Sequence, residues 1–104
     1  MKRMSYEEIA QKREQEDLRI IDVREQDEYD AVHVKGVELF PLSKLREGER
    51  PEPDDRPVAI ICRSGGRSAM ACQILEGEGW EECINVEGGT NAAIEMGEEE
   101  VERG

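Results

Sequence analysis

The chain has 104 residues, which is enough for one domain with a modest core and too few for a second domain. Its formal net charge of −12 argues against nucleic acid as a partner, because phosphate backbones attract basic stripes and the sequence shows none. No apolar run approaches the length of a signal peptide or a membrane span, and the three cysteines cannot all pair with one another, so we expect a soluble, cytoplasmic protein with no membrane partner.

The first half of the chain predicts short helices and strands in alternation. Tyr6–Glu16 has a helical apolar spacing, and Ser5 stands three residues before Glu8, as in a capping box. The stretches that follow predict, in order, a strand at 18–23, a short acidic helix at 25–29, a short strand at 37–40, a turn of helix at 43–45 and a long surface loop at 46–56.

The second half predicts the centre of the fold. Val58–Cys62 is uninterrupted in its apolar character, which indicates a strand buried on both faces, as in a parallel sheet. A helix at 68–77, a strand at 83–86 and a helix at 90–96 are expected next. The alternation predicts a doubly wound α/β domain at residues 1–97, with a mostly parallel sheet of about five strands flanked by helices, and a frayed acidic tail at residues 98–104.

One segment carries the chemistry, and it joins the central strand to the following helix. It consists of Cys62, Arg63, Ser64, Gly65, Gly66, Arg67 and Ser68. The glycines let successive backbone N–H groups turn inward, and the helix adds the positive end of its dipole, so a thiolate is favoured there. We therefore expect Cys62 to be the catalytic nucleophile and residues 63–68 to bind the substrate, with Arg67 turned inward and Arg63 at the mouth.

The length of this loop separates two chemistries. Four residues lie between Cys62 and Arg67, whereas thiol phosphatases of the tyrosine-phosphatase kind need five to surround a phosphoryl group. A smaller ring suits one terminal sulfur atom on the cysteine. Transfer of sulfane sulfur through a Cys62 persulfide is therefore the sharper hypothesis, and a cysteine phosphatase or an arsenate reductase is the weaker one.

The loop and four other blocks resemble a single rhodanese domain. The blocks are Leu18-Arg19-Ile20-Ile21-Asp22-Val23-Arg24 with Glu28-Tyr29, His33-Val34-Lys35-Gly36, Pro41-Leu42, and Ile84-Asn85-Val86-Glu87 followed by Gly88-Gly89, in the order of the family and up to about Gly97. The chain departs from the family at Ala93, where a tryptophan is usual.

This resemblance implies a sulfurtransferase of the thiosulfate type that needs no metal or organic cofactor. Its partners would be a small anionic sulfur donor and a thiophilic acceptor, which is cyanide, a thiol or a partner protein. The alternative is a sulfur-carrier or protein-binding module with little turnover of its own.

The remaining polar and sulfur-containing residues are expected to be structural. Cys72 and Cys83 are interpreted as small buried thiols, although a resolving role for Cys72 in a disulfide mechanism stays open. A zinc site made of the three cysteines and His33 lacks paired ligand spacing. His33 is expected to be a hydrogen-bonded structural residue with no role in sulfur transfer, and Trp80 a packing anchor.

Two charged residues at the end of the 18–23 strand are also expected to be structural. Arg24 should form an ion pair with Glu28 or a neighbouring carboxylate. Asp22 should cap the next helix.

Overall fold

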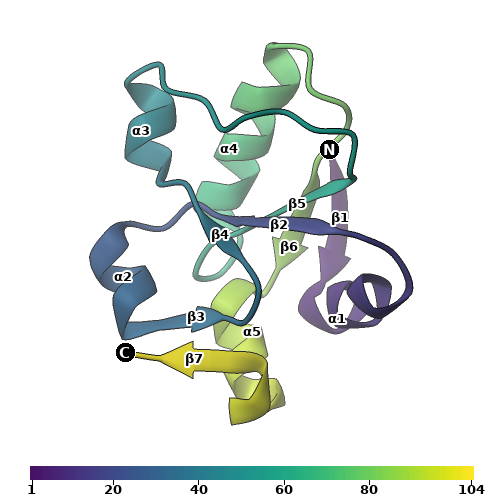
Figure 1. Cartoon of the computed structure of the whole chain (residues 1–104), viewed down its shortest axis with the longest axis vertical. Coiled ribbons are helices and arrows are strands. Elements are labelled where there is room, and N and C mark those ends of the chain that lie inside the picture. The colour runs from purple at the N-terminus through teal and green to yellow at the C-terminus, as the bar shows by residue number, and fades with distance from the viewer.

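The computed structural model describes all 104 residues, which alternate between strands and helices around one central sheet (Figure 1). The sheet has five parallel strands in the order β1-β6-β5-β2-β4, so the predicted α/β class is confirmed. The elements are β1 (Lys2–Ser5), α1 (Tyr6–Gln15), β2 (Arg19–Asp22), α2 (Gln26–Ala31), β3 (Val32–Val34), β4 (Glu38–Leu39), α3 (Leu42–Arg46), β5 (Val58–Ile61), α4 (Gly66–Gly77), β6 (Ile84–Glu87), α5 (Gly89–Met96), the 3-10 turn η1 (Glu98–Glu100) and β7 (Val101–Arg103).

The central strand β5 is buried on both faces, as its apolar run predicted. Successive side chains of a strand point to opposite faces of the sheet. Accordingly, Ala59 and Ile61 belong to one hydrophobic core, and Val58, Ile60 and Cys62 belong to the other. The reactive cysteine is thus anchored by the same alternation that builds the sheet.

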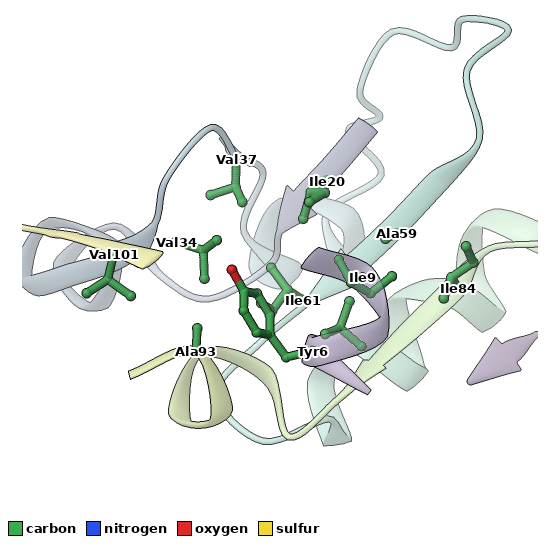
Figure 2. Close-up of a cluster of buried hydrophobic side chains, with 11 residues drawn as sticks. Tyr6, Ile9, Ile20, Val34, Val37, Ala59, Ile61, Ile84, Ala93 and Val101 are labelled. Atoms are coloured by element: carbon green, nitrogen blue, oxygen red, sulfur yellow. The ribbon is translucent and has the colours of Figure 1, made fainter. Parts of the chain in front are cut away.

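Two layers of helices cover the sheet, with α1 and α5 on one face and α3 and α4 on the other (Figure 1). Figure 2 shows the first core, in which Tyr6 and Ile9 of α1 and Ala93 of α5 pack onto the sheet. Ala93 is fully buried there. In the second core, Leu42 and Leu45 of α3 and Ala71, Cys72 and Leu75 of α4 pack together against the same face of the sheet.

Strand β1 lies at an edge of the sheet and was not predicted from the sequence. Its four residues contain no apolar run, and two of them are exposed. The segment is extended because it pairs in parallel with β6, where Lys2 lies opposite Ile84 and Ser5 opposite Glu87. The strand ends at Ser5, whose side chain caps α1 in the predicted capping box with Glu8.

The end of the chain is ordered, so the expectation of a frayed acidic tail was wrong. After η1, strand β7 pairs antiparallel with β3, with Val101 opposite Val34 (Figure 1). Val101 is 4 % exposed and belongs to the first core, and the Tyr6 hydroxyl donates to Glu100 at 2.7 Å. One buried valine and one hydrogen-bonded glutamate therefore hold a segment whose composition alone favours disorder.

Candidate active site

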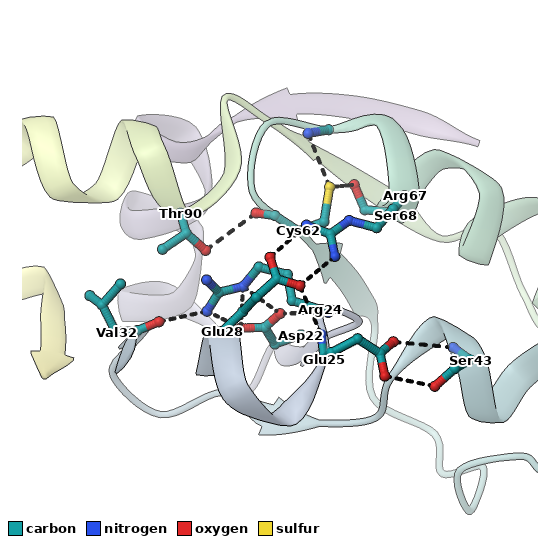
Figure 3. Close-up of polar contacts among 11 residues, drawn as sticks. Asp22, Arg24, Glu25, Glu28, Val32, Ser43, Cys62, Arg67, Ser68 and Thr90 are labelled. Carbon is teal, nitrogen blue, oxygen red and sulfur yellow. Dashed lines mark hydrogen bonds and ion pairs between the residues drawn. The ribbon is translucent and has the colours of Figure 1, made fainter. Parts of the chain in front are cut away.

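Cys62 lies just beyond β5, at the carboxyl end of the parallel strands, and the loop after it leads into α4 (Figure 3). Cys62 is 1 % exposed, so its sulfur forms the floor of the loop. The N–H of Gly65 donates to Sγ of Cys62 at 3.1 Å. Gly65 has a φ of 121°, which side-chain-bearing residues rarely adopt, so glycine allows this inward turn. This is the inward-facing backbone that the two glycines predicted.

The surroundings of the sulfur favour its ionised form. Burial alone raises the pKa of the Cys62 thiol, but hydrogen bonds from the Ser68 hydroxyl and from the N–H groups of Ser68, Gly65 and Ser64 outweigh it, so the pKa is lowered. Inward-turned N–H groups and a helix dipole were the causes expected from the sequence. In the structure, the aimed N–H groups are joined by the hydroxyl of Ser68.

Helix α5 explains why the amides at the start of the loop point inward. The Oγ1 hydroxyl of Thr90 donates to the carbonyl of Cys62 at 3.2 Å (Figure 3). The N–H of Thr90 donates to the same carbonyl at 2.9 Å, and the N–H of Asn91 donates to the carbonyl of Arg63 at 3.1 Å. Across a trans peptide, the carbonyl and the next N–H point in opposite directions. Holding those carbonyls toward α5 therefore turns the N–H groups of Arg63 and Ser64 the other way.

Gly89 permits this contact between α5 and the loop. Its φ is 51°, and a Cβ atom there would clash with the carbonyls of both Cys62 and Arg63. Gly89 is thus the point of close approach between the last helix and the reactive loop.

A buried polar chain lies behind the sulfur. Oγ of Ser68 is 3.3 Å from Sγ of Cys62, and its hydroxyl also hydrogen-bonds Oδ1 of Asn85. Nδ2 of Asn85 in turn donates to the carbonyl of Gly65 at 3.1 Å. Ser68 and Asn85 are both buried, so the loop is tied to β6 as well as to α5.

The two arginines of the loop are placed differently from each other. Arg63 is exposed, in keeping with a position at the mouth. Arg67 was expected to point inward, but its guanidinium binds the carboxylate of Glu28 in α2 through two hydrogen bonds of 2.6 and 2.8 Å (Figure 3). This fork-to-fork pair lowers the pKa of Glu28 to about 2, chiefly through the hydrogen bonds from Arg67.

A second ion pair, which unlike the first is buried, lies at the end of β2. Arg24 donates from Nη2 to Asp22 at 2.9 Å and to the carbonyl of Val32 at 2.7 Å (Figure 3). The predicted pairing of Arg24 with a neighbouring carboxylate is therefore confirmed. The expectation that Asp22 caps the next helix was wrong, because Asp22 accepts from Arg24 and α2 is preceded by a capping box of Glu25 and Glu28.

The other two cysteines lie in the second core and are fully buried. The neighbouring Cys83 thiol and burial raise the pKa of the Cys72 thiol. His33 stacks on Tyr29, and its Nδ1 lies 2.9 Å from the Tyr29 carbonyl. Trp80 packs against the second core. No group of three or more His, Cys, Asp or Glu side chains is arranged to hold a metal ion.

The largest cavity, of about 680 Å³, lies at the opposite end of the sheet from Cys62. Lys2, Val58 and Glu82 are among its lining residues, and they mark the amino ends of β1, β5 and β6. None of the cavities is lined by residues 62–68, and the loop forms a cup around the Cys62 sulfur alone. No helix of the chain is both long enough and apolar enough to cross a bilayer.

The residues that support the loop from outside it, above all Asn85, Thr90 and Asn91, were not predicted from the sequence. Asn85 had a recognisable signal, because it is a polar amide between the apolar residues Ile84 and Val86 of a predicted strand. A polar group in such a place is unfavourable unless it has a partner. Glu28 was expected from the sequence as part of a family motif and as one possible partner of Arg24, and its contact with Arg67 depends on how α2 packs.

Comparison with known proteins places these features in a family. The model of the rhodanese-like domain matches residues 5–95. A thiosulfate sulfurtransferase, GlpE, of Pseudoalteromonas translucida is 30 % identical over 90 residues, which are 86 % of each chain. A putative sulfur carrier protein, YrkF, of Bacillus subtilis is 38 % identical over 71 residues. The chain spans well under two thirds of the length of several such relatives, and the YrkF match covers 68 % of this chain but 38 % of that protein.

Solved structures agree with the sequence matches. A protein of Staphylococcus saprophyticus has a TM-score of 0.82 at 32 % identity, over 99 % of this chain and 100 % of the other. A rhodanese-like domain protein of Staphylococcus aureus has a TM-score of 0.78 at 29 % identity, over 88 % of this chain and 90 % of the other. Since the family model covers nearly the whole chain and the fold is shared with solved members, the chain belongs to the rhodanese-like domain family.

Proposed function

We propose that this protein is a sulfurtransferase that carries sulfane sulfur on Cys62 as a persulfide. The observation that carries the proposal is the convergence of one hydroxyl and several backbone N–H groups on a single cysteine sulfur. Such a cradle stabilises an anionic nucleophile before the reaction and an anionic persulfide after it. Relatives named as a thiosulfate sulfurtransferase and a sulfur carrier add support at the level of the family.

In the first half-reaction, the Cys62 thiolate attacks the outer sulfur of thiosulfate. A new S–S bond forms to Sγ, the S–S bond of the donor breaks, and sulfite leaves with the electron pair. In the second, the outer sulfur of the persulfide takes up a proton from solvent, and an acceptor thiolate or cyanide then attacks that outer sulfur. The S–S bond to Sγ breaks, the acceptor keeps the outer sulfur, and Cys62 returns as a thiolate.

The residues proposed to bind the donor are those of the loop. Arg63 is exposed and offers its charge to the sulfonate end of an approaching donor. The N–H groups of Ser64 and Gly65 and the hydroxyl of Ser68 hold the sulfur itself. Because Cys62 is only 1 % exposed, a slender group such as a terminal sulfur suits the cup better than a bulky ester does.

Intact-protein mass spectrometry after incubation with thiosulfate tests the proposal. The wild-type chain should gain the mass of one sulfur atom, and cyanide should remove it. Cys62→Ser should gain nothing, whereas the control Cys72→Ser, at a buried thiol of the second core, should behave as wild type. Uptake that survives in Cys62→Ser would refute the assignment of the nucleophile.

The burial of Cys62 favours one second candidate, a sulfur carrier with little turnover of its own. A nearly covered sulfur protects a persulfide but slows exchange with free small molecules. Steady-state transfer from thiosulfate to cyanide separates the two. A stable persulfide that forms in the mass spectrum without measurable turnover identifies the carrier. Hydrolysis of a phenyl phosphate ester would instead identify the phosphatase chemistry that the short loop argues against.

A further inference from the structure

A buried amide lies directly behind the serine that contacts the nucleophile. Asn85 is 5 % exposed and stands in β6 between apolar neighbours. Its Nδ2 faces the carbonyl of Gly65, which can only accept a hydrogen bond, so its Oδ1 must face Ser68. The orientation of the amide is therefore determined by its partners.

The Ser68 hydroxyl has one hydrogen, and two acceptors lie within reach of it: Oδ1 of Asn85 and Sγ of Cys62. Oδ1 of Asn85 can only accept, so while Cys62 is a neutral thiol the chain runs from the Cys62 S–H to Oγ of Ser68, and from the Ser68 O–H to Oδ1 of Asn85. Every donor then has an acceptor. When Cys62 loses its proton, the thiolate and Oδ1 compete for the same hydrogen, and the charged acceptor is the stronger of the two.

We propose that Asn85 is a positioning residue whose Oδ1 competes with the Cys62 sulfur for the hydroxyl hydrogen of Ser68. Oδ1 accepts the Ser68 O–H while the sulfur is neutral, and the sulfur accepts it when the sulfur carries negative charge. The donor is thereby held in place beside the sulfur at every stage. Stabilisation of the thiolate is also moderated, because ionisation leaves Oδ1 of Asn85 buried without its donor. A thiolate that is stabilised less remains the better nucleophile.

The inference rests on the proposed sulfur transfer for its catalytic meaning. In a protonated persulfide, Sγ is bonded to the outer sulfur and carries no charge, so the hydrogen stays on Oδ1 of Asn85. As the acceptor removes the outer sulfur, the electron pair of the S–S bond remains on Sγ. The Ser68 O–H then turns from Oδ1 to Sγ and stabilises charge that exists only as the bond breaks.

The charged groups near the sulfur are the same in wild type and in variants at Ser68 and Asn85. They are Arg63 of the loop, Arg67 of α4 with its partner Glu28 of α2, and the buried pair Asp22 and Arg24 at the end of β2. Figure 3 shows the two ion pairs. Substitutions at Ser68 and Asn85 alter no charge. Any difference in the titration of Cys62 that depends on both positions therefore comes from the shared hydrogen.

A double-mutant cycle tests the inference with wild type, Ser68→Ala, Asn85→Leu and the double variant. The rate of alkylation at Cys62, located by mass spectrometry and followed against pH, gives the Cys62 pKa in each protein. Asn85→Leu should lower the pKa of Cys62 more in the wild-type background than in the Ser68→Ala background. The difference between the two shifts should be about one unit, which is about tenfold in the ratio of thiolate to thiol. The loosening of the Gly65 carbonyl is common to both backgrounds and cancels. Equal shifts in the two backgrounds would overturn the inference.

A second measurement needs no substitution in the buried chain. The side-chain carbonyl ¹³C resonance of Asn85 should titrate with the pKa of Cys62 in wild type and stay constant in Cys62→Ala. A ¹³C chemical shift of Asn85 that stays constant while Cys62 titrates in wild type would overturn the inference. This test holds even if a variant of the cycle fails to fold. Neither measurement uses a sulfur donor, so failure of the proposed sulfur transfer is recognised separately, by mass spectrometry with thiosulfate.

Discussion

Replacing Glu28 with glutamine should increase the affinity of the site for an anionic sulfur donor. In the structure both nitrogens at the end of Arg67 are bound to the Glu28 carboxylate, so this cation is neutralised beside the cup. Glutamine has the same shape and serves equally well in the capping box, where Glu28 accepts from the N–H of Glu25 at 3.2 Å. The substitution therefore releases the charge of Arg67 without removing the helix cap.

The size of the effect follows from the exposure of the pair. Arg67 is 36 % exposed and Glu28 is 28 % exposed, which places the pair between a surface ion pair of about 0.2–1 kcal/mol and a buried, charge-assisted pair of about 3 kcal/mol. An intermediate value of about 1.4 kcal/mol corresponds to a tenfold change in affinity. We expect KM for thiosulfate to fall by up to about tenfold, and the free energy of unfolding to fall by about 1 kcal/mol.

Lowering the pH to protonate Glu28 cannot replace the Glu28→Gln substitution in this test. The pKa of Glu28 is lowered to about 2 in the folded protein, from an ordinary value of 4.5. A lowered folded-state pKa means that the stabilisation is fully present above 4.5 and is lost only as the pH falls toward 2. The pair is therefore intact throughout any usable assay range.

The assay is steady-state sulfur transfer to cyanide with thiosulfate varied, at low and at high salt. Glu8→Gln is the matched control, because Glu8 occupies the same capping-box position in α1 without an arginine partner. The gain in Glu28→Gln should shrink at high salt, since Arg67 is partly exposed. An unchanged KM in Glu28→Gln, or an equal change in Glu8→Gln, would refute the idea that Glu28 competes with the donor for Arg67.

Three further outcomes are expected. Gly89→Ala should lower the free energy of unfolding by at least about 2 kcal/mol in chemical denaturation and abolish persulfide formation, because its Cβ would meet backbone carbonyls of the reactive loop that cannot move aside; a stable, active variant would contradict that contact. Val101→Ala should cost about 2 kcal/mol and lower Tm by about 10 °C, whereas the exposed Glu102→Ala on the same strand should change Tm little. Alkylation of Cys62 should have its pH midpoint below the ordinary thiol value of about 8.5, because the lowered pKa leaves more thiolate at each pH; a midpoint above 8.5 would mean that burial outweighs the hydrogen bonds.

The sequence by itself determined the class of fold and the position of the nucleophile, because both depend on local patterns. An apolar run such as Val58–Ile61 must be buried on both faces, and a cysteine followed by two glycines before a helix must lie in a tight turn at the end of a strand. Both patterns predict the same local structure whichever elements the segment packs against.

Only the tertiary structure decided which groups complete the site and which segments are ordered. Arg67 turns to Glu28 because α2 is packed beside the loop, and Asn85 reaches Ser68 because β6 is the neighbour of β5. The last residues form β7 for the same kind of reason, because Val101 packs into the first core against residues of α1, β3 and α5. Contacts between segments far apart in the chain have no local pattern, so their geometry emerges only when the whole sheet and its helices are in place.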